Sequence, residues 1–116
     1  MMSVRELQPQ YLTCVISNGQ TTSGVVDLPN GYALVAIVTP SVLDNATLTF
    51  QAQADGSNWV NVFYEGTQYS ITAATNAARH IALDPRVFAS ADRLRIVMGG
   101  SAAADRTIGL VYRPIN

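Results

Sequence analysis

The chain is short of charge and contains no lysine. Only 13% of its 116 residues are charged, whereas the charged share of a typical soluble domain is about 25%. The seven basic residues are all arginine, and the eight acidic residues leave a net charge of −1. Such a chain offers no basic surface that would release counterions from a phosphate backbone. We therefore expect no nucleic-acid partner.

One cysteine and one histidine are too few for several kinds of site. Cys14 cannot form a disulfide within the chain, because no second cysteine is present. Together with His80 it also cannot supply the full ligand set of a structural zinc ion. Cys14 shares the apolar face of an expected strand with Leu12 and Ile16, which predicts a buried and unreactive thiol. We expect no metal ion and no cofactor.

Long apolar runs are also missing. The longest wholly apolar run covers residues 32–38, whereas a membrane helix needs about 20 apolar residues. The opening segment MMSVRELQPQ contains two charged side chains and no apolar stretch of the kind that a secretory signal requires. We therefore expect no membrane partner and no secretory signal.

Patterns that mark catalytic groups are lacking as well. No Gly-x-Ser-x-Gly motif identifies an activated serine that could work with His80 and Asp84. The carboxylates fall singly in or near expected turns, where aspartate commonly accepts hydrogen bonds from nearby backbone donors. A glycosidase pair assembled from distant loops is the enzymatic alternative. We predict a protein that is not an enzyme and has no catalytic residues.

What the sequence does contain is a series of short apolar runs separated by turn residues such as Asn18-Gly19. These runs recur at the spacing typical of β-sandwiches and barrels. They predict an all-β fold, an antiparallel β-sandwich of eight or nine short strands with jelly-roll or immunoglobulin-like connections. The expected strands cover residues 11–17, 21–28, 32–38, 47–54, 59–64, 69–73, 81–83, 93–98 and 107–113.

One short helical turn is expected within residues 84–92. Asp84 is suited to the N-cap position, and Pro85 is suited to the first helical position because its φ angle is already helical. The run at 32–38 is apolar on both faces, which predicts a strand that is covered on both sides.

The strongest local signal is a hairpin between residues 47 and 64. Strict alternation in its first strand predicts one buried face and one wet face. A four-residue turn at 55–58 would place Ala54 opposite Trp59 and Phe50 opposite Phe63. This register predicts that both Trp59 and Phe63 point into the core.

The first ten residues show no sustained alternation. We therefore divide the chain into an N-terminal arm at 1–10 and a β-sandwich domain at 11–116. Lysine side chains on the edge strands of soluble sandwiches commonly prevent pairing with other chains, and this sequence contains no lysine. Low charge is typical of the centre of a protein–protein interface, so the composition favours a subunit of an assembly.

The aromatic residues raise a second possibility. Tyrosine and tryptophan have an apolar body and a polar tip, and an exposed ring can stack against a sugar. Core packing is favoured for Trp59 by the hairpin register. Tyr64 and Tyr69 are the candidate sugar platform.

Several segments together resemble small β-sandwich proteins encoded in the structural gene blocks of tailed bacteriophages. The hairpin LTFQAQADGSNWVNV looks like the family pattern "LTF…S.DG..W..V". The other matching segments, in order, are Thr39-Pro40, IALDPRVF at 81–88, RLRI at 93–96 and DRTIGLVYRP at 105–114. The resemblance extends from residue 31 to residue 114.

The resemblance implies a virion component without catalytic residues: a head decoration (cement) protein, the base of a head spike or fibre, or a tail or fibre module. The leading hypothesis is a capsid decoration protein that stabilises the head shell. It would be made in the cytoplasm of the bacterial host and lie on the outer surface of the capsid. Its partners would be copies of itself, as a homotrimer or another symmetric oligomer, and the major capsid protein. The candidate interface arm comprises Val4, Arg5, Leu7, Pro9 and Tyr11.

The alternative hypothesis places the same fold in a tail or fibre. There it would be a carbohydrate-binding module that recognises cell-surface glycans through Tyr64 and Tyr69.

Overall fold

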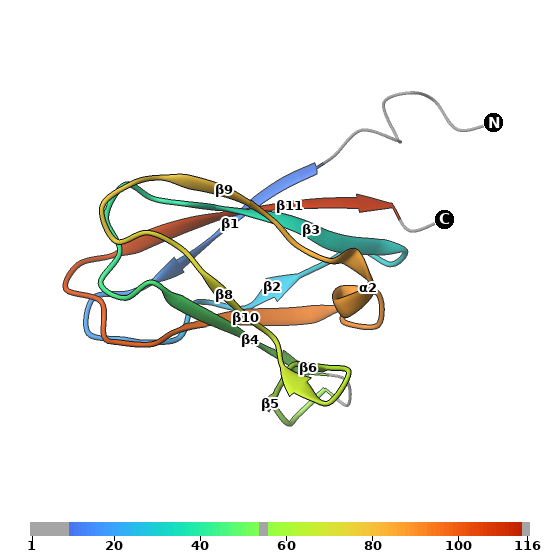
Figure 1. Cartoon of the computed structure of the whole chain (residues 1–116). Coiled ribbons are helices and arrows are strands. Elements are labelled where there is room, and N and C mark those ends of the chain that lie inside the picture. Colours follow the sequence, from blue (N-terminus) through green and yellow to red (C-terminus); the bar gives the residue numbers. More distant parts are fainter. Residues whose placement is uncertain (1–9, 54–55, 115–116) are drawn as a thin grey trace.

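Alternating apolar and polar residues build two antiparallel sheets that pack face to face, as Figure 1 shows. The computed structural model describes residues 10–53 and 56–114. Sheet A contains four strands in the spatial order β1 (Gln10–Ile16), β11 (Arg106–Pro114), β3 (Tyr32–Thr39) and β9 (Arg79–Ala82). The strands at the two ends of the chain are therefore neighbours. The prediction of an all-β sandwich is confirmed.

Sheet B forms the second layer. Its spatial order is β2 (Val26–Asp27), β10 (Arg93–Met98), β4 (Thr47–Gln53) and β5 (Val60–Asn61), and β8 (Ser70–Thr72) pairs with the other end of β4. A small ribbon of β6 (Phe63–Tyr64) and β7 (Thr67–Gln68) extends from this layer. The two-residue strand β7 was not predicted from the sequence.

The core lies between the two sheets and is filled by alternate residues of each strand. In sheet B, Leu94, Ile96 and Met98 are almost completely buried. In sheet A, Ile108 and Leu110 meet them from the opposite layer and are also fully buried. The alternation in β10 and β4 therefore separates a buried face from a face that is more exposed, except that Gln53 on the outer face is itself buried.

The expected helical turn is present as α2 (Pro85–Phe88). Asp84 caps it, since its side-chain Oδ1 accepts a hydrogen bond of 3.0 Å from the backbone N–H of Arg86. The turn directs Phe88 into the open end of the sandwich, where its ring centroid lies 5.0 Å from that of Phe50 and 5.6 Å from that of Tyr69. This aromatic cluster joins α2 to sheet B.

The predicted register of the hairpin is wrong by one residue. The structure pairs Ala52 with Val60 and Gln51 with Asn61. A shift of one residue turns every side chain of a strand to the other face, so Phe63 points outward and is 59% exposed. The physical reason is Asn61, whose amide would be buried in the predicted register but here accepts a 3.1 Å hydrogen bond from Gln51.

Trp59 also departs from the prediction. Its ring is only half-buried, and the guanidinium carbon of Arg95 lies 4.5 Å from the ring centroid. Arg95 belongs to the outward face of β10, because it pairs with Gln51. Trp59 therefore packs on the outside of sheet B rather than in the core.

Strand β3 is apolar on both faces, as predicted, but its outer side chains Val35 and Val38 remain half-buried. A register shift interrupts the pairing with β11, because Ala36 pairs with Val111 while Leu34 pairs with Tyr112. Val35 is the extra residue of this β-bulge, and such a bulge bends the strand.

An ion pair fastens the start of β11 to the loop between β3 and β4. Arg106 donates from Nε to Oδ2 of Asp44 at 2.9 Å and from Nη2 to Oδ1 at 3.2 Å. Both side chains are 17% exposed. The Arg106 guanidinium is the main reason that the pKa of Asp44 is lowered below its ordinary value.

This pair predicts an acid-dependent contribution to stability. The lowered pKa of Asp44 means that the contribution is present above the unfolded-state pKa and is lost as the pH falls through the folded-state pKa. Asp44→Asn is therefore expected to unfold more easily than the parent at pH 7, with the difference shrinking below about pH 4. Urea unfolding at a series of pH values measures this.

The control is Asp27→Asn, because Asp27 forms an exposed ion pair with Arg93 and its side chain is 72% exposed. Exposed pairs contribute little, so this variant should resemble the parent at every pH. A difference between Asp44→Asn and the parent that stayed constant from pH 7 to pH 2 would contradict the assignment.

Candidate functional site

The outward face of sheet A carries almost no charge. Opposed residues of an antiparallel pair share a face, and the outward residues are those opposed across β1, β11, β3 and β9. We call this surface the sheet-A face. It consists of Tyr11, Thr13, Val15, Ala33, Ala36, Val38, His80, Ala82, Thr107, Gly109, Val111 and Arg113, of which Ala33 and Ala36 are buried. Arg113 carries the one formal charge in this set, so an area spanning four strands is nearly neutral.

Tyr11 lies across the middle of the sheet-A face. Its side chain is 60% exposed, and its phenol ring lies against the backbone of Gly109 on the neighbouring strand. A Cβ atom on Gly109 would stand 2.7 Å from Cζ of Tyr11, which is too close for any real side chain. Gly109 therefore gives the ring a place to lie flat on β11.

A groove of about 330 Å³ is open at one end of the sheet-A face, where β3 and β11 meet α2. Its lining is mainly apolar and comprises Ala33, Val35, Pro85, Arg86, Ala89, Arg113 and Pro114. Arg86 is bound to Asp84 through two nitrogen–oxygen contacts. Arg113 has no ion-pair partner within residues 10–53 and 56–114. The groove extends the apolar surface toward α2.

The candidate interface arm can be placed only in part. Val4, Arg5, Leu7 and Pro9 lie outside the described residues. Tyr11 is on the sheet-A face, and strand β1 begins at the residue before it, Gln10, which pairs with Tyr112.

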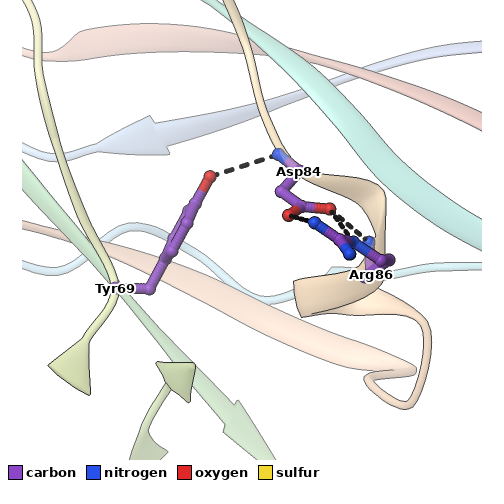
Figure 2. Close-up of polar contacts among 3 residues, drawn as sticks. All are labelled: Tyr69, Asp84 and Arg86. Carbon is purple, nitrogen blue, oxygen red and sulfur yellow. Dashed lines mark hydrogen bonds and ion pairs between the residues drawn. The ribbon is translucent and has the colours of Figure 1, made fainter. Parts of the chain in front are cut away.

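The candidate sugar platform is not an open pair of rings. Figure 2 shows Tyr69 pointing toward α2, where its hydroxyl oxygen accepts a 3.2 Å hydrogen bond from the backbone N–H of Asp84. The Tyr69 ring also packs against Phe50 and Phe88, so it belongs to the aromatic cluster of the core. Tyr64 is half-buried, and the Arg86 guanidinium lies 5.8 Å from its ring centroid. The two tyrosines therefore do not form one exposed surface.

Arg86 and Asp84 form the other contact drawn in Figure 2. The Asp84 carboxylate receives hydrogen bonds from the backbone and from the guanidinium of Arg86. These bonds lower the pKa of Asp84, with the Arg86 guanidinium as the largest cause. Asp84 serves as a helix cap with an ionised side chain, which is a structural role.

The outward face of sheet B is strongly polar and was not singled out from the sequence. Arg93 and Arg95 project from the same face of β10, and each guanidinium is bonded to a glutamine of β4. Arg93 Nη1 donates to Gln53 at 2.6 Å, and Arg95 Nε donates to Gln51 at 2.7 Å. We call Arg93, Arg95, Gln51, Gln53, Asn61 and Trp59 the sheet-B array. The alternation of arginine and glutamine with apolar residues in RLRI and FQAQ is the signal that could have revealed it.

Cys14 and His80 do not form part of a reactive group. Burial raises the pKa of the Cys14 thiol, although a hydrogen bond with Ser23 opposes the effect. His80 is exposed on β9, at the edge of sheet A. Within residues 10–53 and 56–114, no cluster of three or more histidine, cysteine, aspartate or glutamate residues could hold a metal ion.

The buried thiol leads to a simple labelling prediction. Cys14 is 6% exposed, and a buried thiol reacts only when the protein opens. An aromatic disulfide reagent is therefore expected to label the folded protein very slowly and the urea-unfolded protein at once. Absorbance of the released thiolate follows the reaction, and rapid labelling without denaturant would contradict the placement of Cys14.

The chain was also compared with known proteins. No protein-family model matches it, and no curated protein matches it either. Among the described residues, no helix is long and apolar enough to cross a membrane.

Proposed function

We propose that this chain is a non-enzymatic structural protein of a tailed-phage virion, which decorates the head shell and stabilises it. The proposal combines the resemblance of residues 31–114 to phage β-sandwich proteins with one structural observation. That observation is the nearly neutral sheet-A face, which spans four strands and carries Arg113 as its one formal charge.

Self-association through this face follows from its composition. Apolar side chains on an open sheet gain stability when a second surface removes them from water. Val15 and Tyr11 are 37% and 60% exposed. The free energy that burial of these side chains would contribute is therefore not realised in the single chain. A second copy of the chain, in a homotrimer or another symmetric oligomer, is the partner that we propose.

Attachment to the shell needs no tight single contact. A symmetric oligomer that touches several copies of the major capsid protein binds through multiple weak contacts, which raises its overall affinity by effective concentration. Strand β1 lies at the edge of sheet A, so its unpaired side can contribute to such contacts.

The test is co-sedimentation of the full chain with shells assembled from the major capsid protein of the same genome. We expect binding that saturates at a fixed ratio of chain to capsid protein, and shells that withstand a higher temperature once decorated. Absence of the chain from the shell pellet at micromolar concentration would contradict the proposal.

A further inference from the structure

The outward face of sheet B faces away from the sheet-A face and carries a second set of features. We propose that Arg95 and Trp59, together with neighbouring amides of the sheet-B array, bind an acidic sugar: a pyranose ring that bears a carboxylate, within a polysaccharide chain. This ligand is separate from the assembly partners proposed above, because the two surfaces lie on opposite sides of the sandwich (Figure 1).

The Arg95 side chain is held in one orientation. Its Nε donates a 2.7 Å hydrogen bond to Gln51, and the Gln51 amide in turn donates to Asn61 at 3.1 Å. The guanidinium carbon stands 4.5 Å from the centroid of the Trp59 ring. One edge and one face of the guanidinium are therefore occupied, and the terminal Nη groups have no protein acceptor among the described residues.

Arg95 also has no ion-pair partner among the residues that the structure describes. The guanidinium groups of Arg86, Arg93 and Arg106 each form an ion pair with an aspartate. No such pair forms at Arg95 within residues 10–53 and 56–114, although its side chain is half-buried. A fixed, partly desolvated guanidinium with free terminal nitrogens fits a carboxylate, which accepts two parallel hydrogen bonds from it.

Arg93 extends the site along the strand. It lies two residues before Arg95 on the same face, so their Cα atoms are about 7 Å apart. Arg93 Nε binds Asp27 and Nη1 binds Gln53, which leaves Nη2 without an acceptor among the described residues. Among the described residues, Arg93, Arg95 and the Asp27 carboxylate give this part of the surface one net positive charge, while the whole chain carries −1.

The groups around Arg95 favour a sugar over an acidic protein segment. Across the sheet, the outward neighbours of Arg95 are Gln51 and Asn61, whose amides can donate to and accept from hydroxyl groups. The Trp59 indole is half-buried and Arg95 lies over one of its faces, so a sugar ring would place its C–H groups against the part of the indole that remains exposed. The centre of a protein–protein interface is usually more apolar than the surface around Arg95, which consists of amides and guanidinium groups.

Trp59 is the one tryptophan of the chain, so its fluorescence reports on the site directly. The probe is an oligogalacturonate, with a neutral cello-oligosaccharide of the same length and poly-L-glutamate as comparison ligands. We expect the oligogalacturonate to shift the Trp59 emission in a saturable way at low ionic strength, and expect weaker binding as salt is added. Equal binding of the neutral sugar, equal binding of poly-L-glutamate, or no binding of any ligand would each overturn the proposal.

Two variants and one matched control locate the ligand. Arg95→Gln should weaken oligogalacturonate binding about tenfold or more, because a charge-assisted pair is lost. Arg79→Gln removes the same charge from an exposed position on β9 and should bind like the parent. Trp59→Phe, followed by calorimetry, should also bind less tightly. Equal losses in Arg95→Gln and Arg79→Gln would mean that net charge alone drives binding, and would overturn the assignment to this site.

Discussion

Replacing Val111 by glutamate is expected to prevent the self-association that we propose for the sheet-A face. Val111 lies at the centre of the sheet-A face, opposed to Tyr11 on one side and to Ala36 on the other. A carboxylate buried at such an interface costs several kcal/mol even with Arg113 two residues away on the same face, so the dissociation constant of the proposed assembly should rise about a hundredfold or more. Light scattering at micromolar concentration measures the change in mass.

The matched control for this experiment is Val42→Glu. Val42 is 48% exposed in the loop between β3 and β4 and lies outside the sheet-A face. The same substitution there should leave the assembly intact, because the added carboxylate stays in water. If both variants dissociated equally, general repulsion between negative chains would explain the result and the sheet-A face would not be the interface.

Removing the Phe88 ring is expected to cause the largest loss of stability. Phe88 is completely buried, with ring contacts to Phe50 and Tyr69. Phe88→Ala should lower the free energy of unfolding by about 3–5 kcal/mol. That is a large share of the roughly 5–15 kcal/mol that a domain possesses. Urea unfolding measures the loss, and Phe88→Leu, which keeps most of the volume, should lose clearly less and remain folded.

Phe63→Ala is the control, and it also tests the hairpin register. Phe63 is 59% exposed in the structure, whereas the register expected from the sequence would bury it. Substitutions of exposed residues usually change the free energy of unfolding by no more than about 0.5 kcal/mol. A loss at Phe63 as large as the loss at Phe88 would support the register expected from the sequence and contradict the structure.

The strands that alternate strictly were predictable because one physical reason explains both the pattern and the fold. In β10 and in most of β4, buried residues alternate with half-buried or exposed ones, and the alternation of apolar and polar residues in the sequence follows this pattern. The cap at Asp84 was predictable for a similar reason, since an aspartate before proline suits the first turn of a helix.

The hairpin register could not be read in the same way. The segment from Trp59 to Tyr64 carries large apolar residues on both faces, so alternation alone does not say which face is buried. The deciding group is Asn61, whose amide finds its partner in Gln51 only when the two residues are opposed. The register therefore depends on contacts between the two strands, and the pattern within one strand does not reveal which residue of the other strand lies opposite.

The composition of the two outer faces could not be predicted without knowing the order of the strands in each sheet. The low charge of the sequence led us to expect an interface. Only the strand order β1, β11, β3, β9 shows that Tyr11, Val111 and Val38 share one surface. Likewise, the contact between Arg95 and Trp59 joins residues far apart in the chain. The position of Tyr69 in the aromatic cluster beside α2, apart from an open pair with Tyr64, also depends on contacts between distant segments.

The most direct test of the central claim is the solution mass of the unmodified chain at micromolar concentration. The chain has a mass of 12.4 kDa, so association through the sheet-A face predicts a multiple of that value, and three copies would give about 37 kDa (3 × 12.4). A protein that stayed at 12.4 kDa across the whole concentration range would contradict assembly through this face.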